Sequence, residues 1–269
     1  MQRSFKERDD IEYAAIVLDL DGTFLSSSKT VSKRNLEAVL RCKANGMRVI
    51  VATARPPRSV RMLLPAEMLV TCSFVYYNGA LVEDMETGFE RHFPIEKSTT
   101  AAILDYCSAH LPNCGISLEV RDEWFAISGP IDEEVFMTRH FQPKVHSNDE
   151  LKALDATKIL ITYVEDPEEL RRHFGERVHF VVTDKGTLIQ IMNRMLSKAS
   201  GAALLLQQFG VPLSKVMVFG DDYNDLELFE MPVHKVAMHN AVDRLKELAD
   251  QITDSNDNDG VAKVLEQIS

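Results

Sequence analysis

The segment from Ile16 to Thr23 constrains the fold of this chain more than any other stretch. Its first residues have the apolar composition of a buried strand, which ends in two carboxylates, Asp19 and Asp21. Gly22 then allows the backbone to turn away. This layout places acids at the carboxyl end of a strand, where ligands bind in open α/β sheets. Alternate side chains of a strand share a face, so both acids are expected to face one site.

Two carboxylates so close together suggest a metal. Asp19 and Asp21 are expected to repel each other unless a cation or a shared proton lies between them. The alternative is structural, because an Asp-Gly pair is also a common turn that ends a buried strand. The segment alone leaves both interpretations open.

Composition is typical of a soluble globular protein. The 269 residues are 45% hydrophobic and 26% charged, and the formal net charge is -11. The negative charge argues against a nucleic acid or an anionic membrane as partner. No apolar run approaches the ~20 residues that span a bilayer, and Met1–Asp10 lacks the apolar core of a secretory signal. A cytoplasmic location is expected, with no membrane partner.

Helix and strand patterns alternate in the first third of the chain. The sequence predicts a helix that starts near Ser32, strands over Met47–Ala52 and Phe74–Tyr77, and a short helix over Arg58–Leu64. A strand, a helix and a second strand form a crossover unit, which implies a parallel sheet. The same alternation returns from Lys198 onward.

The middle of the chain has a different pattern. Short strands occur in pairs, such as Ile116–Val120 with Trp124–Ser128, and helices such as Ser98–His110 and Asp132–His140 lie between them. Mixed strands and helices of this kind suggest an inserted α+β domain.

Residues suited to phosphate chemistry stand at predicted strand ends or helix starts. They are Asp19, Asp21, Thr53, Lys198, Asp221, Asn224 and Asp225. Because the carboxyl ends of parallel strands meet at one edge, residues far apart in sequence can gather there. A carboxylate can attack phosphorus and form an aspartyl-phosphate, and a second can donate a proton and later accept one. Mg2+ suits oxygen ligands of this type.

These residues resemble the four motifs of the haloacid dehalogenase superfamily. The matching pieces are Asp19-Leu20-Asp21-Gly22-Thr23, Thr53, Lys198 and Gly220-Asp221-x-x-Asn224-Asp225. The insert, together with Val236–Ala241 and Asn258–Val261, looks like the Cof-type branch with its large α/β cap. The resemblance implies a Rossmann-like, doubly wound parallel-sheet core over residues 1–83 and 191–269. It also implies an inserted α+β cap over residues 84–190 that sets substrate specificity.

The resemblance also implies a role for each motif residue. Asp19 would be the nucleophile and Asp21 the general acid/base. Mg2+ would be held by the side chains of Asp19 and Asp221 and by the backbone carbonyl of Asp21. The phosphoryl group would be bound by Leu20, Thr53, Ala54, Lys198 and Asn224. Asp225 and Asp222 would lie behind these ligands, with Asp225 orienting Lys198 or a metal-bound water.

We therefore expect a Mg2+-dependent phosphatase that acts on small phosphorylated metabolites, with sugar phosphates as the first candidates. Pyridoxal phosphate and flavin mononucleotide are further candidates, and the expected oligomeric state is a monomer or weak homo-oligomer. A phosphomutase would use the same machinery, and a non-catalytic sugar-phosphate sensor would use the same binding groups. Arg55 and Arg58 have two interpretations, contact with a second anionic group of a substrate or solvation at the surface.

Overall fold

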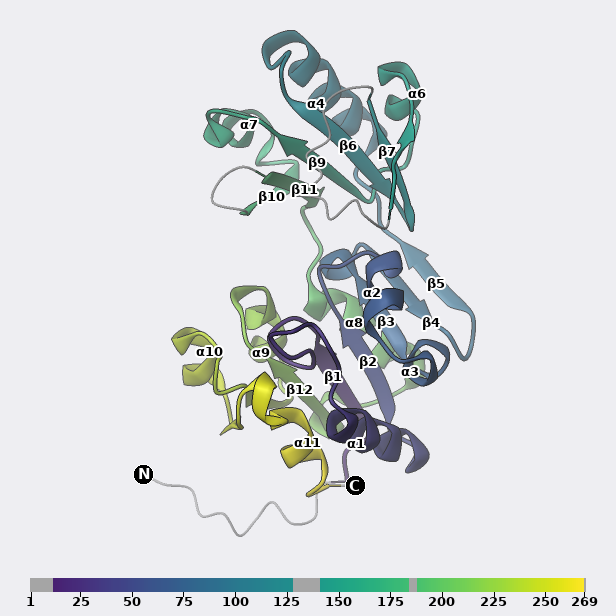
Figure 1. The fold of residues 1–269 in the computed structure, drawn as a ribbon, viewed down its shortest axis with the longest axis vertical. Helices are drawn as coiled ribbons and strands as arrows, with labels where there is room; N and C mark the ends of the chain where they lie inside the picture. The colour runs from purple at the N-terminus through teal and green to yellow at the C-terminus, as the bar shows by residue number, and fades with distance from the viewer. Residues whose placement is uncertain (1–11, 128–140, 184–187, 269) are drawn as a thin grey trace. The chain divides into compact units, whose positions relative to one another are not determined.

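The computed structural model describes residues 12–127, 141–183 and 188–268 (Figure 1). The predicted helix over Asp132–His140 lies outside these residues. The chain divides into two compact units, each described here by itself. The first unit contains the described residues up to Arg55, then Ser59–Glu90 and the chain from Ser197 onward. The second contains Pro56–Arg58 and the described part of Arg91–Leu196.

The first unit is built on an eight-stranded sheet in the order β14-β13-β12-β1-β2-β3-β4-β5. Its strands are β1 (Ala15–Asp19), β2 (Arg48–Ala52), β3 (Ser73–Tyr76), β4 (Leu81–Asp84), β5 (Phe89–His92), β12 (Val216–Gly220), β13 (His234–Ala237) and β14 (Gln251–Ile252). The strands from β14 to β3 pair in parallel, and β4 pairs antiparallel with β3. Every residue of β1 and β12 is buried, as expected for central strands of a parallel sheet.

The helices of this unit lie between its parallel strands in the chain, except α11, which follows the last strand. They are α1 (Lys33–Ala44), α2 (Pro57–Leu63), α3 (Ala66–Thr71), α8 (Lys198–Phe209), α9 (Leu226–Glu230), α10 (Asp243–Leu248) and α11 (Gly260–Leu265). Short 3-10 turns are η2 (Tyr77–Gly79), η4 (Leu213–Lys215), η5 (Tyr223–Asp225) and η6 (Asn256–Asn258). Ser32 caps α1 by accepting a hydrogen bond from the Asn35 amide, which confirms the predicted start. Ser197 caps α8 in the same way, so that helix begins at Lys198.

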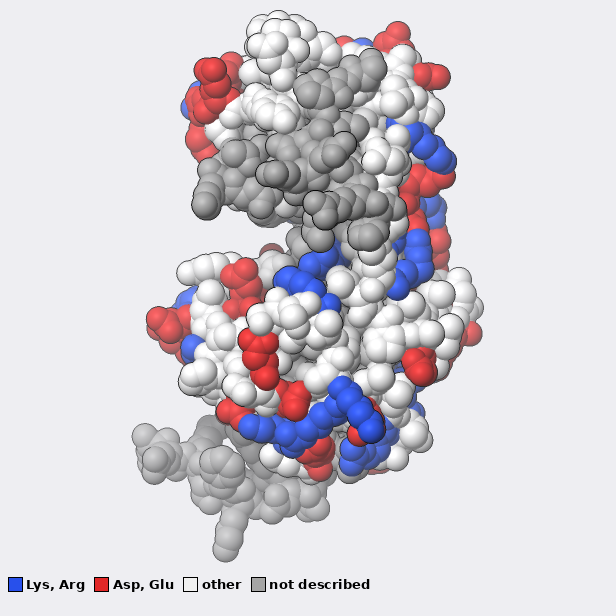
Figure 2. Space-filling view, viewed as in Figure 1, with Lys and Arg blue, Asp and Glu red and all other residues white. Residues whose placement is uncertain are grey.

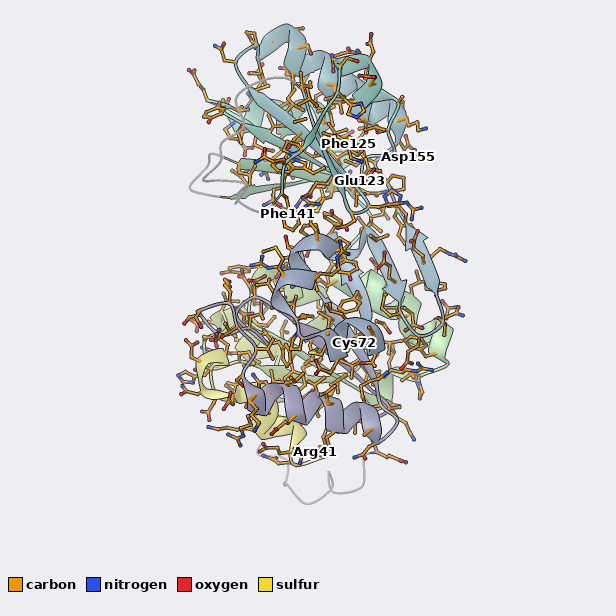
Figure 3. The ribbon with its side chains drawn as sticks, turned by 45° about the vertical axis from the view of Figure 1, so that its right-hand side comes forward. Arg41, Cys72, Glu123, Phe125, Phe141 and Asp155 are labelled. Atoms are coloured by element: carbon orange, nitrogen blue, oxygen red, sulfur yellow. The ribbon has the colours of Figure 1, made fainter. Side chains whose placement is uncertain are left out.

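The second unit contains a six-stranded sheet in the order β10-β11-β9-β6-β7-β8. Its strands are β6 (Gly115–Val120), β7 (Glu123–Ala126), β8 (Lys144–Val145), β9 (Lys158–Thr162), β10 (Val178–Thr183) and β11 (Leu188–Asn193), and its helices are α4 (Lys97–His110), α6 (Asn148–Lys152) and α7 (Pro167–Phe174). Apolar side chains of the sheet, such as Phe125, and of the helices form one buried cluster (Figure 3). The insert therefore has its own hydrophobic core.

The chain passes from one unit to the other a few residues later than expected, and the strand pairing explains the difference. The expected boundary at residues 83 and 84 falls inside β4, which pairs with β3 and extends the first sheet. The boundary at residues 190 and 191 falls inside β11, which pairs with both β9 and β10 of the second sheet. The observed changes come instead at Glu90–Arg91, within the edge strand β5, and at Leu196–Ser197, after β11 has ended.

The described residues also show how apolar the helices are and how charge is distributed on one face. None of the helices described is both long enough and apolar enough to cross a membrane. On the face seen in Figure 2, lysine and arginine side chains are interspersed with aspartate and glutamate.

Candidate active site

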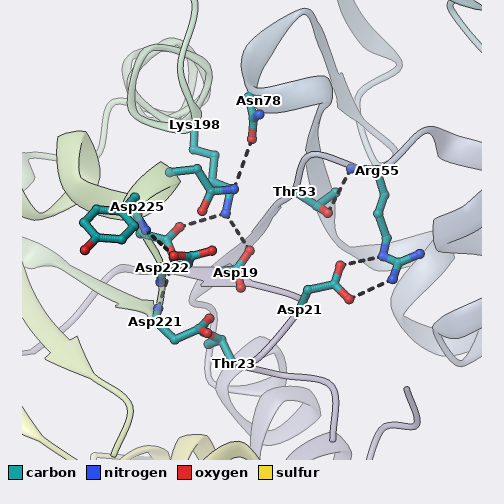
Figure 4. Close-up of polar contacts among 12 residues, drawn as sticks. Asp19, Asp21, Thr23, Thr53, Arg55, Asn78, Lys198, Asp221, Asp222 and Asp225 are labelled. Carbon is teal, nitrogen blue, oxygen red and sulfur yellow. Dashed lines mark hydrogen bonds and ion pairs between the residues drawn. The ribbon is translucent and has the colours of Figure 1, made fainter. Parts of the chain in front are cut away.

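Three neighbouring parallel strands carry the predicted site residues to one edge of the first sheet. β1 lies between β12 and β2, with Leu18 opposite Phe219 and Asp19 opposite Ala52. Asp19 is the last residue of β1, while Thr53 and Asp221 directly follow β2 and β12. The register therefore brings these three residues together (Figure 4).

A buried lysine joins two of the aspartates. Lys198 Nζ lies 2.6 Å from Asp19 Oδ1 and 2.8 Å from Asp225 Oδ1. The three side chains are 1%, 5% and 0% exposed, respectively. Lys198 sits at the first position of α8, and the Ser197 cap fixes that position. The ammonium thus reaches the sheet edge from the start of a helix that is separated from β1 by most of the sequence.

Asp225 has protein donors at both of its carboxylate oxygens. Its Oδ1 accepts from Lys198, and its Oδ2 accepts from the backbone amides of Asp221 and Asp222 at 3.0 and 3.2 Å. Asp222 in turn accepts from the Tyr223 amide at 2.7 Å and starts the η5 turn. Asp225 therefore holds the loop after β12 in shape and anchors Lys198.

Asp19, Asp221 and Asp225 form an acidic cluster. Within the described chain they offer oxygen atoms that all lie within 4.8 Å of one another. Asp221 also accepts a 2.8 Å hydrogen bond from the Thr23 hydroxyl. Lys198 pairs with two of these carboxylates, those of Asp19 and Asp225, so the cluster carries excess negative charge when all three are ionised.

The crowding changes the protonation of these groups. Burial raises the pKa of Asp19 well above its usual value, the Lys198 ammonium opposes this, and Asp225 and Asp221 add to the rise. Burial and the nearby Asp225 likewise raise the pKa of Asp221 to about 6. Burial would lower the pKa of Lys198, but Asp19 and Asp225 outweigh it and raise that pKa. An added cation would therefore offset the repulsion between these carboxylates.

Asp21 points away from this cluster. Arg55 donates to both of its oxygens, from Nε at 2.5 Å and from Nη2 at 2.7 Å (Figure 4). Lys29 Nζ also donates to Asp21, at 2.6 Å. Burial would raise the pKa of Asp21, but the hydrogen bonds from Arg55 and Lys29 outweigh it and lower that pKa. The two acids of the first motif therefore have separate cationic partners.

The other predicted phosphate-binding residues lie at the same edge with different exposure. Leu20 and Thr53 are buried, Ala54 is half-buried and Asn224 is exposed. The Thr53 hydroxyl accepts a 3.1 Å hydrogen bond from the Arg55 amide. Asn224 contacts Asn78, with Nδ2 3.5 Å from Asn78 Oδ1.

Sequence analysis did not assign four contact residues, namely Thr23, Lys29, Arg55 and Asn78. Thr23 lies within the first motif, and Arg55 lies two residues after Thr53, so both stood beside recognised positions. Two interpretations were considered for Arg55, and neither included the contact that the structure shows, in which its guanidinium binds Asp21. Asn78 was predicted only as part of an Asn78-Gly79 turn, and Lys29 was assigned no role; the two residues have positive φ values of 52° and 59°.

Comparison with known proteins identifies the family. Residues 16–265 match the family described as haloacid dehalogenase-like hydrolase. The chain belongs to the haloacid dehalogenase-like hydrolases. The resemblance seen in the motifs, including the Cof-type branch, is therefore confirmed, as are the α/β fold class and the class of activity, phosphoric monoester hydrolysis.

Individual members of the family match along almost the whole chain. The 5-amino-6-(5-phospho-D-ribitylamino)uracil phosphatase YitU of Bacillus subtilis (strain 168) is 30% identical over 261 residues, covering 94% of this chain and 96% of its own. YcsE of the same organism, a phosphatase named for the same compound, is 28% identical over 263 residues, covering 96% and 97%. A crystal structure from Thermotoga maritima superposes with a TM-score of 0.86 at 26% identity, covering 96% and 98%.

Proposed function

We propose that this phosphatase is Mg2+-dependent and hydrolyses small phosphorylated metabolites through an aspartyl-phosphate on Asp19. The observation that carries the proposal is the cluster of Asp19, Asp221 and Asp225, in which Lys198 pairs with Asp19 and Asp225 and supplies, among the described residues, the one ammonium that contacts the cluster. Carboxylates crowded together in a buried site either keep a proton or are stabilised in their ionised forms by a compensating cation. One lysine supplies one positive charge, and a divalent ion would supply the remainder.

The donor set at the cluster suits Mg2+. Carboxylate and carbonyl oxygens are the ligands this ion prefers. Asp225 already has donors on both oxygens, so we assign the metal to the side chains of Asp19 and Asp221. The backbone carbonyl of Asp21 would complete the protein's share. Bound there, Mg2+ would offset the charge between the nucleophile and the phosphoryl group.

Each residue at this edge of the sheet has a separate role in phosphoryl transfer. Asp19 attacks phosphorus, while Lys198 neutralises charge beside it. The Thr53 hydroxyl, the amides of Leu20 and Ala54, and the side chain of Asn224 bind phosphoryl oxygens. Asp225 keeps Lys198 in place, and Asp222 shapes the loop behind it.

Asp21 serves as general acid and then as general base. It gives a proton to the oxygen of the departing group, and its carboxylate later takes a proton from the water that attacks the aspartyl-phosphate. A carboxylate at this position distinguishes phosphate-ester hydrolysis from reactions that need no proton donor.

The substrate is a small phosphorylated metabolite, and the inserted α+β domain provides its specificity. Sugar phosphates are the first candidates. The ribityl-aminouracil phosphate named for YitU and YcsE is a second candidate, favoured by the matches of this chain to both proteins along nearly their full length. Both candidates present a phosphate on a hydroxyl-rich carbon chain.

The test is phosphate release from a panel of hexose, pentose and hexitol phosphates and the ribityl-aminouracil phosphate. The chain is assayed with Mg2+ and with excess chelator, beside Asp19→Asn and the matched control Asp243→Asn, whose side chain is exposed on α10. We expect turnover only with Mg2+, loss in Asp19→Asn and retention in the control. Undiminished turnover by Asp19→Asn would refute the proposal.

The same panel separates the two alternatives. A phosphomutase would convert a hexose 1-phosphate into its isomer without releasing phosphate. A sensor would bind a panel member and release phosphate from none of them.

A further inference from the structure

Arg55 makes a bidentate contact with Asp21, and the proposed function assigns no role to this contact. Arg55 grips both carboxylate oxygens, at 2.5 Å from Nε and 2.7 Å from Nη2. Two parallel hydrogen bonds of this kind fix the plane of a carboxylate, whereas a single ammonium contact leaves it free to rotate. Lys29 adds only a single contact, from a side chain that is 50% exposed.

Hydrogen bonds fix the backbone of Arg55 through both its amide and its carbonyl. The Arg55 amide donates to Thr53 Oγ1 at 3.1 Å, and its carbonyl accepts from the Tyr77 amide at 3.3 Å. Thr53 itself exchanges backbone hydrogen bonds with Val75 and Asn78, at 2.8 and 3.0 Å. Arg55 is thus braced against the end of β3 rather than carried on a free loop.

The bracing segment adopts a costly backbone conformation. Tyr77 and Asn78 have φ values of 53° and 52°, in the left-handed region that non-glycine residues rarely adopt. This conformation turns their two amides back onto Arg55 and Thr53. The phosphate-binding Thr53 and the partner of Asp21 therefore share one rigid support.

We propose that Arg55 is a positioning residue that fixes the carboxyl of Asp21 for proton transfer to the leaving group. The inference rests on the proposed function. Lys198 draws the Asp19 carboxylate to one side of the sheet edge, and Arg55 draws that of Asp21 to the other. The nucleophile and the proton donor are thereby kept apart, each with its own cation.

The proton balance shows when this contact matters. In the first step an Asp19 oxygen bonds to phosphorus, the bond from phosphorus to the ester oxygen breaks, and that oxygen takes the proton of Asp21. Asp21 is left as a carboxylate, which Arg55 stabilises. In the second step water attacks phosphorus, the carboxylate takes a proton from that water, and the bond from Asp19 to phosphorus breaks.

The contact should therefore matter most for leaving groups that need a proton. An alkoxide is strongly basic and departs only when protonated, whereas p-nitrophenolate departs readily without a proton. We expect Arg55→Ala to reduce kcat/KM by about 100-fold on alkyl phosphates and by less than about 10-fold on p-nitrophenyl phosphate, a difference within the usual contribution of a general acid. A loss of stability alone would affect both substrates equally.

The experiment measures kcat/KM over a series of phenyl and alkyl phosphates for the wild-type chain, Arg55→Ala, Arg55→Lys and the control Arg244→Ala. Arg244 is an exposed arginine of α10 that pairs with Glu247 in the same unit. The ratio kcat/KM covers the steps up to departure of the leaving group. Thermal unfolding confirms that each variant is folded, and Arg55→Lys carries the test where Arg55→Ala does not fold.

We expect a steeper dependence on leaving-group basicity in both Arg55 variants, because lysine restores the charge but not the two-point contact, and no change in Arg244→Ala. An unchanged slope in both Arg55 variants would overturn the inference. So would a rise in KM confined to substrates with a second anionic group, since this would make Arg55 a substrate ligand. A wild-type chain that hydrolyses no ester of the series would instead refute the proposed function.

Discussion

Lys198 Nζ lies 2.6 Å from Asp19 Oδ1, although 179 positions separate the two residues in the sequence. The contact is buried, and Asp225 shares the same ammonium at 2.8 Å. A buried ammonium with two carboxylate partners stays charged, which agrees with the raised pKa of Lys198. The start of α8 and the end of β1 are therefore joined by an interaction that is both structural and placed beside the proposed nucleophile.

Replacing this lysine should disable the site. Lys198→Met keeps most of the volume and leaves Asp19 and Asp225 buried without their shared cation. We expect kcat to fall by about 100- to 1,000-fold, the usual loss when one charge-stabilising donor is removed. Steady-state kinetics on the best panel substrate measures this. Lys198→Arg retains the charge in a side chain of different shape, so its kcat should fall less. Equal rates for the Lys198→Met variant and the wild-type enzyme would contradict the prediction.

Asp225 should contribute mainly to stability. Its side chain is fully buried and accepts from Lys198 and from two backbone amides. Removing one partner of a buried pair typically costs about 3–5 kcal/mol. We therefore expect Asp225→Ala to lower the free energy of unfolding by about that amount and Asp225→Asn by less. Urea unfolding measures both variants, with Asp243→Ala, at an exposed position of α10, as the control that should stay within about 0.5 kcal/mol of wild type.

The acidic cluster was predictable because strand ends were recognisable. Asp19, Thr53 and Asp221 each follow an apolar run, and the crossover pattern implied parallel strands whose carboxyl ends meet. The partners of Asp21 were not predictable in the same way. Arg55 and Lys29 reach it through loops whose paths depend on left-handed residues such as Asn78, and single-sequence patterns do not specify such torsion angles.

The join between the units was hard to predict for a related reason. Short strands such as β4 have the same sequence pattern whether they extend the first sheet or begin the second. The antiparallel pairing with β3, from Ser73 opposite Asp84 to Tyr76 opposite Leu81, assigns β4 to the first sheet. The alternation of apolar and polar residues identifies a strand, but it does not say which strand will be its partner in the folded chain.

Gly22 should be sensitive for a steric reason. Its φ is +88°, and a Cβ placed there would lie 2.1 Å from Asp221 Oδ2. Gly22→Ala should displace the Asp221 carboxylate and weaken both activity and Mg2+ binding. Gly46 has almost the same φ, +87°, with nothing within 4 Å of a Cβ. Gly46→Ala therefore isolates the backbone cost, and comparable kinetic losses in the two variants would show that the Asp221 contact is unimportant.

Stabilisation by Mg2+ should depend on pH. The pKa of Asp221 is raised to about 6 from 3.8, so in the metal-free folded chain this carboxyl keeps its proton over a range where the unfolded chain has lost it. Its contribution to stability is thus complete below pH 3.8 and is lost as pH rises through about 6. Asp19, whose pKa is also raised, acts in the same direction. Mg2+ needs the ionised forms, so its binding should relieve this loss at neutral pH and compete with protons at lower pH.

We expect Mg2+ at about 100 times its Kd to raise Tm by about 5–10 °C at pH 7.5, and by clearly less at pH 5. Thermal unfolding with and without Mg2+ at the two pH values measures the difference. Asp221→Asn removes both the titrating proton and a proposed ligand, so its Tm should respond weakly to Mg2+ at either pH. An equal Mg2+ response of the wild-type chain at pH 5 and pH 7.5 would mean that the ion binds elsewhere, because a site made of Asp19 and Asp221 must release protons to accept it.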